Sequence, residues 1–276
     1  MMLGIMAGSN SSLVALAICG AVGIMASPAR AQDGDRALLA TFCDAANIRG
    51  SACTRAKAYP DTAGRACDVK LSKDRYTGRF AAAGPALLVI AYDSGCEPHA
   101  TDFGGAVVFE QAGTATRFNG FLPGAQPRNC VTLPKDKRQD LLVCITGHMG
   151  QGHLETGVAL MNFTRNYSKG IAISPDFLMT AEDSIGAYGA NVVTCKEQSH
   201  YFGVSKLSPG PRPGTVIADI TYADAETIRT ACGKGFPKPK EVFGELAPGD
   251  AYVPPGYEKT GRIMIDLTNR EVTPAR

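Results

Sequence analysis

Residues 86–92 read ALLVIAY and residues 141–146 read LLVCIT, and these two apolar runs decide the fold class. Both runs are short, rich in aliphatic residues and bounded by Gly, Pro, Asn or Asp, which is typical of β-strands. Each is followed by a Gly-containing loop and then by a second run, GAVVF from Gly105 and GVALM from Gly157. The pattern predicts a strand–loop–strand unit that occurs at least twice.

A weaker third copy begins at Val192, and more strands are expected at residues 215–221 and 262–267. A strand–loop–strand unit that recurs about every 50 residues is typical of propeller blades or of a stacked β-meander. We therefore expect a mainly β, antiparallel repeat that is propeller-like or a partial propeller. A β-sandwich with similar hairpins is the alternative.

Residues 135–145 (KDKRQDLLVCI), the Gly-rich loop after them and GVALM from Gly157 resemble an FG-GAP or VCBS-type propeller repeat. The resemblance covers residues 86–207 and implies a propeller fold. The calcium loop of that family, an Asp-x-Asp-x-Asp-Gly run, is absent, and only Asp136 and Asp140 are left of it, among three basic residues. Because calcium prefers a cage of several oxygen ligands, calcium binding is not expected at this turn.

The N-terminus resembles a secretion signal. Residues 13–27 form an apolar stretch, and Ala29-Arg30-Ala31 follows as an A-x-A cleavage site. The stretch is short for a membrane span, so we expect residues 1–31 to be removed after Ala31 and the mature protein to lack a transmembrane helix. Because residues 1–12 contain no Lys or Arg, a misassigned start or an uncleaved anchor is the alternative.

The mature chain divides into two predicted parts. Residues 32–66 are expected as a helical N-terminal cap, with helices at 36–46, begun by Asp35, and at 51–59. Residues 67–276 are expected as the β-repeat domain.

Eight of the nine cysteines follow the predicted signal, and in an oxidising compartment they are expected to form four disulfides. Cys130 and Cys144 flank a polar turn, and cross-strand neighbours in such a hairpin lie within disulfide reach. The remaining expected pairs are Cys43–Cys53, Cys67–Cys96 and Cys195–Cys232. The predicted localisation is therefore periplasmic or secreted.

Composition and motifs limit the classes of function. The mature chain has 27 basic and 26 acidic residues and no basic stripe, which argues against a nucleic-acid partner. It contains no G-x-S-x-G, H-E-x-x-H, P-loop or C-x-x-C motif, so no catalytic residue and no cofactor is assigned. The loop at residues 93–102 offers three carboxylates for hydrolysis, Asp93, Glu97 and Asp102.

Three of the four histidines, His99, His153 and His200, follow the first strand of successive copies. If equivalent loops share one face, these imidazoles are candidate ligands for zinc, copper or an anion, with His148 nearby. The alternative is that histidine is one polar residue among several at a loop tip.

Together these features favour a secreted or periplasmic β-repeat module that binds an envelope or extracellular ligand and does no catalysis. The alternatives are an extracytoplasmic hydrolase that uses residues 93–102 and a structural envelope protein.

Overall fold

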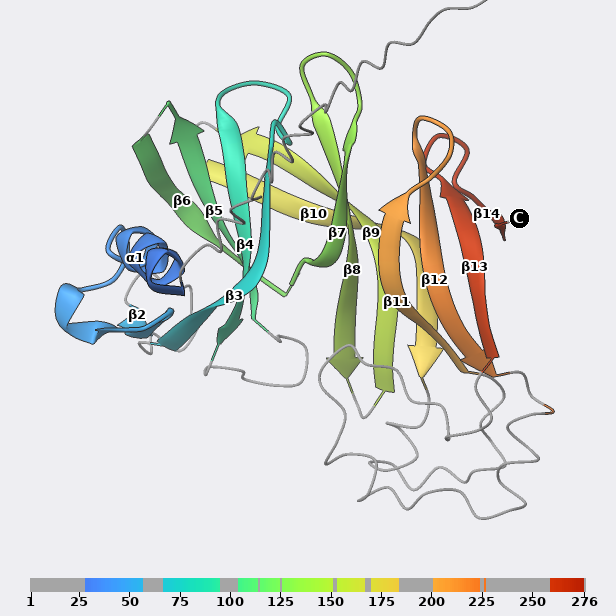
Figure 1. The fold of residues 1–276 in the computed structure, drawn as a ribbon, viewed down its shortest axis with the longest axis horizontal. Coiled ribbons are helices and arrows are strands. Elements are labelled where there is room, and N and C mark those ends of the chain that lie inside the picture. Colours follow the sequence, from blue (N-terminus) through green and yellow to red (C-terminus); the bar gives the residue numbers. More distant parts are fainter. Residues whose placement is uncertain are drawn as a thin grey trace, which may run out of the picture.

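The computed structural model shows a chain of antiparallel strands with a short helical start (Figure 1). It describes residues 28–56, 67–94, 104–113, 115–124, 126–150, 153–166, 170–183, 201–223, 226 and 259–275. The N-terminal segment comprises α1 (Pro28–Leu39), the 3₁₀ turn η1 (Ala45–Asn47), β1 (Ile48–Arg49) and β2 (Ala52–Ala56).

The remaining described strands form three consecutive four-stranded antiparallel meanders, which we call units one, two and three. Unit one contains β3 (Cys67–Gly78), β4 (Ala86–Ser94), β5 (Gly105–Ala112) and β6 (Ala115–Pro123). Unit two contains β7 (Arg128–Pro134), β8 (Asp140–Gly150), β9 (His153–Asn166) and β10 (Gly170–Asp183). Unit three contains β11 (Tyr201–Pro209), β12 (Thr215–Ala223), β13 (Lys259–Asp266) and β14 (Glu271–Pro274).

Two sheets contain these strands. β1 and β2 extend the sheet of unit one, while units two and three belong to one eight-stranded sheet. The junction between units two and three is narrow, because β10 and β11 pair only at Asp183 and Tyr201. The structure confirms the prediction of a mainly β, antiparallel, disulfide-stabilised fold with a short helical start.

Three apolar cores lie between successive layers, which are the N-terminal segment and units one, two and three. The first lies between the N-terminal segment and unit one and includes Leu39 and Phe109. The second lies between units one and two and includes Val89 and Leu142. The third lies between units two and three and includes Val143, Val158, Val216 and Ile265.

The layering explains why the central strands are apolar at almost every position. In β4, Leu87 and Val89 face the second core, whereas Ile90 and Tyr92 face the first. A strand that is buried on both faces has no exposed side to fill with polar residues. The same reasoning applies to β8, where Leu142 faces the second core and Val143 the third.

Equivalent positions of the first two repeat copies face successive cores. Val89 of the first copy faces the second core, and its equivalent Val143 faces the third. Likewise Phe109 faces the first core, and its equivalent Met161 faces the second. The two copies are therefore stacked in the same sense, one layer apart.

Contacts between first strands and between last strands repeat along the stack. Among the first strands, the Cys130 N–H on β7 donates to the Tyr76 hydroxyl on β3 (3.1 Å), and Asn129 Nδ2 donates to the carbonyl of Ser205 on β11 (3.1 Å). Among the last strands, Asn119 Oδ1 on β6 accepts from the N–H of Ile171 on β10 (2.7 Å). Units one and two thus lie side by side at both edges, and units two and three lie side by side at the edge of their first strands.

The N-terminal segment differs from the expected pair of helices. α1 begins before residue 36, and Asp35 lies inside it, where its carboxylate pairs with Arg75 (2.5 Å) instead of capping the helix. The second expected helix, at residues 51–59, is wrong, because Ala52–Ala56 forms β2. Cys53 and Ala56 of this strand are buried against the first core while its backbone pairs with β3, and this burial outweighs the local preference for a helix.

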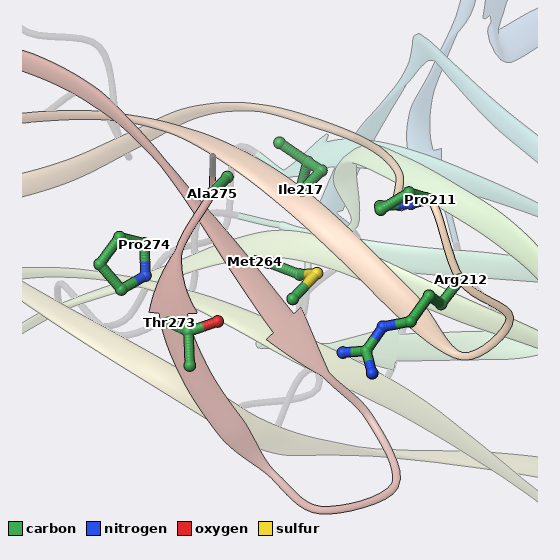
Figure 2. A pocket seen from close by; sticks show the side chains of 7 residues that line it. All are labelled: Pro211, Arg212, Ile217, Met264, Thr273, Pro274 and Ala275. Carbon is green, nitrogen blue, oxygen red and sulfur yellow. The ribbon is translucent and has the colours of Figure 1, made fainter.

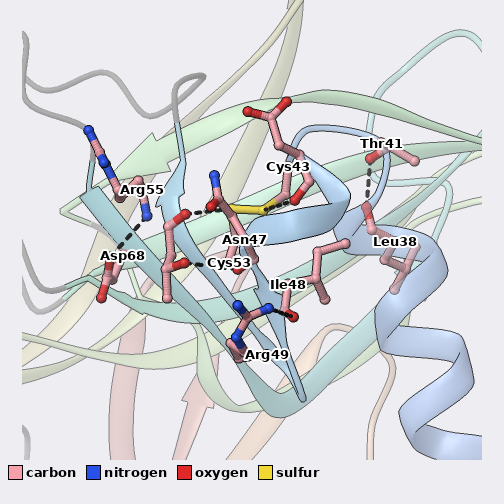
Figure 3. The surroundings of a disulfide bond; sticks show 11 residues. Leu38, Thr41, Cys43, Asn47, Ile48, Arg49, Cys53, Arg55 and Asp68 are labelled. Atoms are coloured by element: carbon pink, nitrogen blue, oxygen red, sulfur yellow. Dashed lines mark hydrogen bonds between the residues drawn. A yellow bond between two sulfur atoms is a disulfide. The ribbon is translucent and has the colours of Figure 1, made fainter.

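Two expected disulfides are confirmed. Cys43 and Cys53 are bonded with their Cα atoms 5.9 Å apart (Figure 3), and Cys130 and Cys144 join β7 to β8 with Cα atoms 4.0 Å apart. The polar turn between β7 and β8 is also present, because the Lys135 N–H donates to the Gln139 carbonyl.

Cys67 is disulfide-bonded too, and its partner lies outside the described residues. Cys96, Cys195 and Cys232 also lie outside the described residues, so the pairs Cys67–Cys96 and Cys195–Cys232 stay predictions.

The third repeat copy is positioned differently from the sequence-based expectation. Its first run, residues 191–195, lies outside the described residues, and its second run lies in β11, the first strand of unit three. The strands that occupy the central positions of unit three are β12 and β13.

Candidate functional site

The described residues form an open groove of about 730 Å³ between units two and three. Its walls come from the upper end of the fold in Figure 1, where the turns β7–β8, β11–β12 and β13–β14 lie. The polar side chains in its lining are those of Lys135, Gln139, Asp140, Asn162, Thr164 and Thr268. Leu141, Leu160, Met161, Leu267 and the nearby prolines supply apolar walls.

One face of β9 changes from buried apolar residues to exposed polar residues where the strand reaches this groove. Val158 on this face is buried in the third core and Leu160 packs against it, but Asn162 and Thr164, the next residues on the same face, are exposed. Side chains of a strand alternate between its two faces, so these four residues form one row. The row therefore runs from the third core into the solvent-filled groove.

Contacts to the β3–β4 loop hold the β7–β8 turn in place. The Arg79 N–H donates to Asp140 Oδ2 (2.8 Å), and Gln139 Nε2 donates to the Phe80 carbonyl (3.0 Å). Lys135 Nζ in turn donates to Gln139 Oε1 (3.1 Å). These contacts connect units one and two and fix one wall of the groove before any ligand binds.

The carboxylates around the groove are already engaged. Asp136 accepts the N–H groups of Arg138 and Gln139, and these two bonds hold its pKa below the usual value. Asp266 accepts the N–H groups of Asn269 and Thr268, which lowers its pKa in the same way. Hydrogen bonds to the charged form of a carboxylate stabilise that form. Both groups are therefore occupied as acceptors in their turns.

The free polar groups of the groove are neutral. Within the described part of the chain, the side chains of Asn162, Thr164 and Thr268 make no hydrogen bond. An amide and two hydroxyls supply both donors and acceptors. The described lining residues contain no His, Cys or Ser and only one carboxylate, Asp140, so they suit binding better than acid–base or nucleophilic chemistry.

None of the histidines singled out from the sequence is among the described residues that line this groove. His153 is the first residue of β9 and pairs with Gly150 across a tight turn, so it belongs to a strand instead of an open loop. His148 lies in β8, opposite Glu155. His99 and His200 lie outside the described residues, and the described residues contain no cluster of three groups that could hold a metal ion. A shared histidine site stays a prediction.

The acidic loop proposed for hydrolysis is described only at its start. Asp93, near the end of β4, accepts a hydrogen bond from Gln126 Nε2 (2.8 Å), and this amide also donates to the Tyr92 carbonyl. Asp93 therefore anchors the chain between units one and two. Glu97 and Asp102 lie outside the described residues.

The groove was not predicted from the sequence, although the sequence contains a signal for it. In residues 158–164 (VALMNFT) every odd-numbered position is apolar, while the even-numbered positions change from Val and Leu to Asn and Thr. A strand with one apolar face and a second face that turns polar midway leaves its core at that point.

Among the described residues, no helix is both long enough and apolar enough to cross a membrane. No protein-family model, curated protein or solved structure matches this chain.

Proposed function

We propose that the protein is an exported β-repeat binding module and that its ligand occupies the groove between units two and three. The observation that carries the proposal is the combination of unpaired neutral polar groups and apolar walls in one open groove of about 730 Å³. Ligand sites are typically concave and apolar, with a few polar groups that fix orientation.

The groove favours a small, neutral, hydroxylated ligand. Asn162, Thr164 and Thr268 offer hydrogen bonds without a net charge, and Asp140 is held by the Arg79 backbone. The described lining residues hold one cation, Lys135, and one carboxylate, Asp140, so they offer no cluster of like charges to a strongly charged ligand. Neutral polyols and saccharides match this set of donors and acceptors.

Export is supported by the A-x-A site at Ala29–Ala31 and by the disulfides of the described residues. Disulfides persist mainly in oxidising compartments. We expect the mature protein to begin at Gln32, in the periplasm or outside the cell, and to contain no free thiol. N-terminal sequencing and thiol titration of native protein check this, and a retained residue 1–31 segment or several reactive thiols would contradict it.

The stacking of the units supports a propeller-like repeat. The first strands β3, β7 and β11 are neighbours, and β6 and β10 are neighbours at the opposite edge. Radially arranged blades have their first strands together in this way. The likeness to FG-GAP or VCBS-type repeats belongs to the same proposal.

The binding function is tested by a panel of neutral polyols and saccharides, with native mass spectrometry and thermal unfolding as readouts. A ligand that binds only the native state raises the melting temperature with its concentration. Thr164→Trp fills the groove, and Thr77→Trp places the same ring on the exposed face of β3 in unit one.

We expect a panel member to stabilise the wild type and Thr77→Trp but not Thr164→Trp. If no member of the panel binds the wild type, or if Thr164→Trp binds equally well, the proposed groove function is wrong.

A further inference from the structure

A second hollow, of about 580 Å³, lies on the face of unit three that points away from the third core (Figure 2). Its lining is mostly apolar, with Ile217 and Met264 among the apolar groups. Arg212 and Thr273 are its polar members. It is separated from the groove between units two and three by the β11–β12 turn, because Pro211 and Arg212 line one and Pro213 and Gly214 line the other.

Strand register places the floor of this hollow in one row. Ile217 on β12 pairs with Met264 on β13, and Met264 pairs with Thr273 on β14. Directly paired residues of antiparallel strands point to the same face of the sheet. The row is therefore an apolar strip across three strands that ends at the Thr273 hydroxyl.

Arg212 is held rigidly beside this strip. Prolines on both sides, Pro211 and Pro213, restrict the backbone. Thr215, which is 1% exposed, accepts the Arg212 N–H at its hydroxyl oxygen (3.3 Å) and donates that hydroxyl to the Arg212 carbonyl (2.7 Å). The guanidinium thus projects from a fixed backbone while its side chain is 62% exposed.

The charged group among the described residues that line this hollow is the Arg212 guanidinium, whose ion-pair partner is Asp266. Arg212 Nη2 lies 3.6 Å from Asp266 Oδ2, which is longer than an ordinary hydrogen bond. The other oxygen of Asp266 is occupied by the N–H groups of Thr268 and Asn269. The described residues that line the hollow include no carboxylate, so an anion that binds Arg212 competes with only one nearby carboxylate, Asp266, which lies outside this lining.

The next row of the same face limits the apolar strip. Two residues further along, Asp219 pairs with Arg262 and forms an ion pair with it (3.3 Å). The strip therefore lies between Arg212 on one side and a compensated ion pair on the other. The row from Ile217 through Met264 to Thr273 spans about 10 Å, since neighbouring strands lie about 4.8 Å apart.

We infer that this hollow binds a small amphipathic monoanion, with its carboxylate on Arg212 and Thr273 and its apolar body on Ile217 and Met264. A charge-assisted hydrogen bond to guanidinium orients the head group, and burial of the ligand's apolar body against the partly exposed Met264 and the exposed Pro274 supplies the remaining affinity, since Ile217 is already only 6% exposed. This site is independent of the groove between units two and three.

The test uses sodium octanoate and octylamine as probes, with methyl-labelled methionine NMR of the whole mature protein. Met264→Leu assigns the Met264 methyl signal. We expect octanoate to shift that signal saturably and octylamine, with the opposite charge, to bind at least about tenfold more weakly. Arg212→Gln is expected to raise the dissociation constant for octanoate about tenfold or more, because it removes a charged hydrogen bond.

Arg138→Gln removes the same charge from the exposed β7–β8 turn and is the matched control, with an unchanged dissociation constant expected. Three results would overturn the inference: no saturable shift at Met264, equal binding of octanoate by Arg212→Gln, or equal binding of octylamine.

Discussion

Replacing Arg165 by Met tests how units one and two are held together. Arg165 lies near the end of β9 in unit two, and its Nη1 pairs with Glu110 Oε1 on β5 of unit one. Its Nε also donates to the Ala83 carbonyl in the β3–β4 loop (3.0 Å). The Glu110 side chain is only 6% exposed, so loss of a partner leaves a buried charge less well compensated.

The expected cost follows from the bonds that are lost. A hydrogen bond to a charged group contributes about 1.5–3 kcal/mol and a neutral one about 1 kcal/mol, so Arg165→Met should lower the free energy of unfolding by about 2–4 kcal/mol. Arg117→Met is the matched control, since Arg117 pairs with Oε2 of the same carboxylate. Its side chain is 75% exposed, so water can replace it, and a cost below about 1 kcal/mol is expected.

Urea unfolding followed by far-ultraviolet circular dichroism measures both variants, because the chain contains no Trp for fluorescence. Equal losses for Arg165→Met and Arg117→Met, or a larger loss for Arg117→Met, would refute the reasoning that burial of the partner decides the cost.

The same carboxylate predicts a dependence on pH. The hydrogen bond from Arg117, followed by that from Arg165, holds the pKa of Glu110 below its usual value of 4.5 despite the opposing effect of burial. A carboxylate with a lowered pKa in the folded state stabilises the fold above the unfolded pKa, and this stabilisation is lost as the pH falls through the folded pKa. When the pH is lowered below about 4.5, the free energy of unfolding should therefore fall less for Glu110→Gln than for the wild type.

Three further predictions concern single contacts. Replacing Cys130 and Cys144 together by Ala should lower the free energy of unfolding by about 2–4 kcal/mol in urea unfolding, and peptide mapping of the native protein should join these two cysteines. Gly84→Ala should cost at least about 1 kcal/mol in the same assay, because Gly84 has φ +98° and a Cβ there would lie 2.5 Å from Arg165 Nη2. Burial raises the pKa of Tyr76 to about 12, so spectrophotometric titration should show a tyrosine with that pKa in the wild type that is lost in Tyr76→Phe.

Four of the strands predicted from the sequence are buried on both faces. β4, β5, β8 and β9 appear as continuous apolar runs because each lies between two cores. β3 was not predicted, because its buried residues Cys67, Val69 and Leu71 alternate with polar ones. The strand therefore contains no continuous apolar run of the kind that identified the others. The exposed strand β14 has no buried residue to reveal it.

The strands of unit three could not be assigned from a constant repeat interval in the sequence. Residues 224–258 separate β12 from β13, whereas only residues 151 and 152 separate β8 from β9. A repeat of about 50 residues therefore matched β11, although β12 and β13 are the central strands of unit three. Insertions between strands change the sequence interval without changing the order of strands in the unit.

Both candidate sites lie where the layered burial ends. Each apolar core lies between two successive layers. A strand face that no neighbouring layer covers either carries polar residues or keeps an apolar surface in contact with solvent. The face of β9 becomes polar at Asn162 and Thr164, which line the groove between units two and three. The outer face of unit three stays apolar at Met264 and its neighbours, and the described residues provide no further unit to cover it. The N-terminal segment covers the corresponding face of unit one with α1 and the Cys43–Cys53 loop. The described stack is therefore asymmetric, because the N-terminal segment covers the outer face of unit one, whereas the outer face of unit three keeps the hollow lined by Met264.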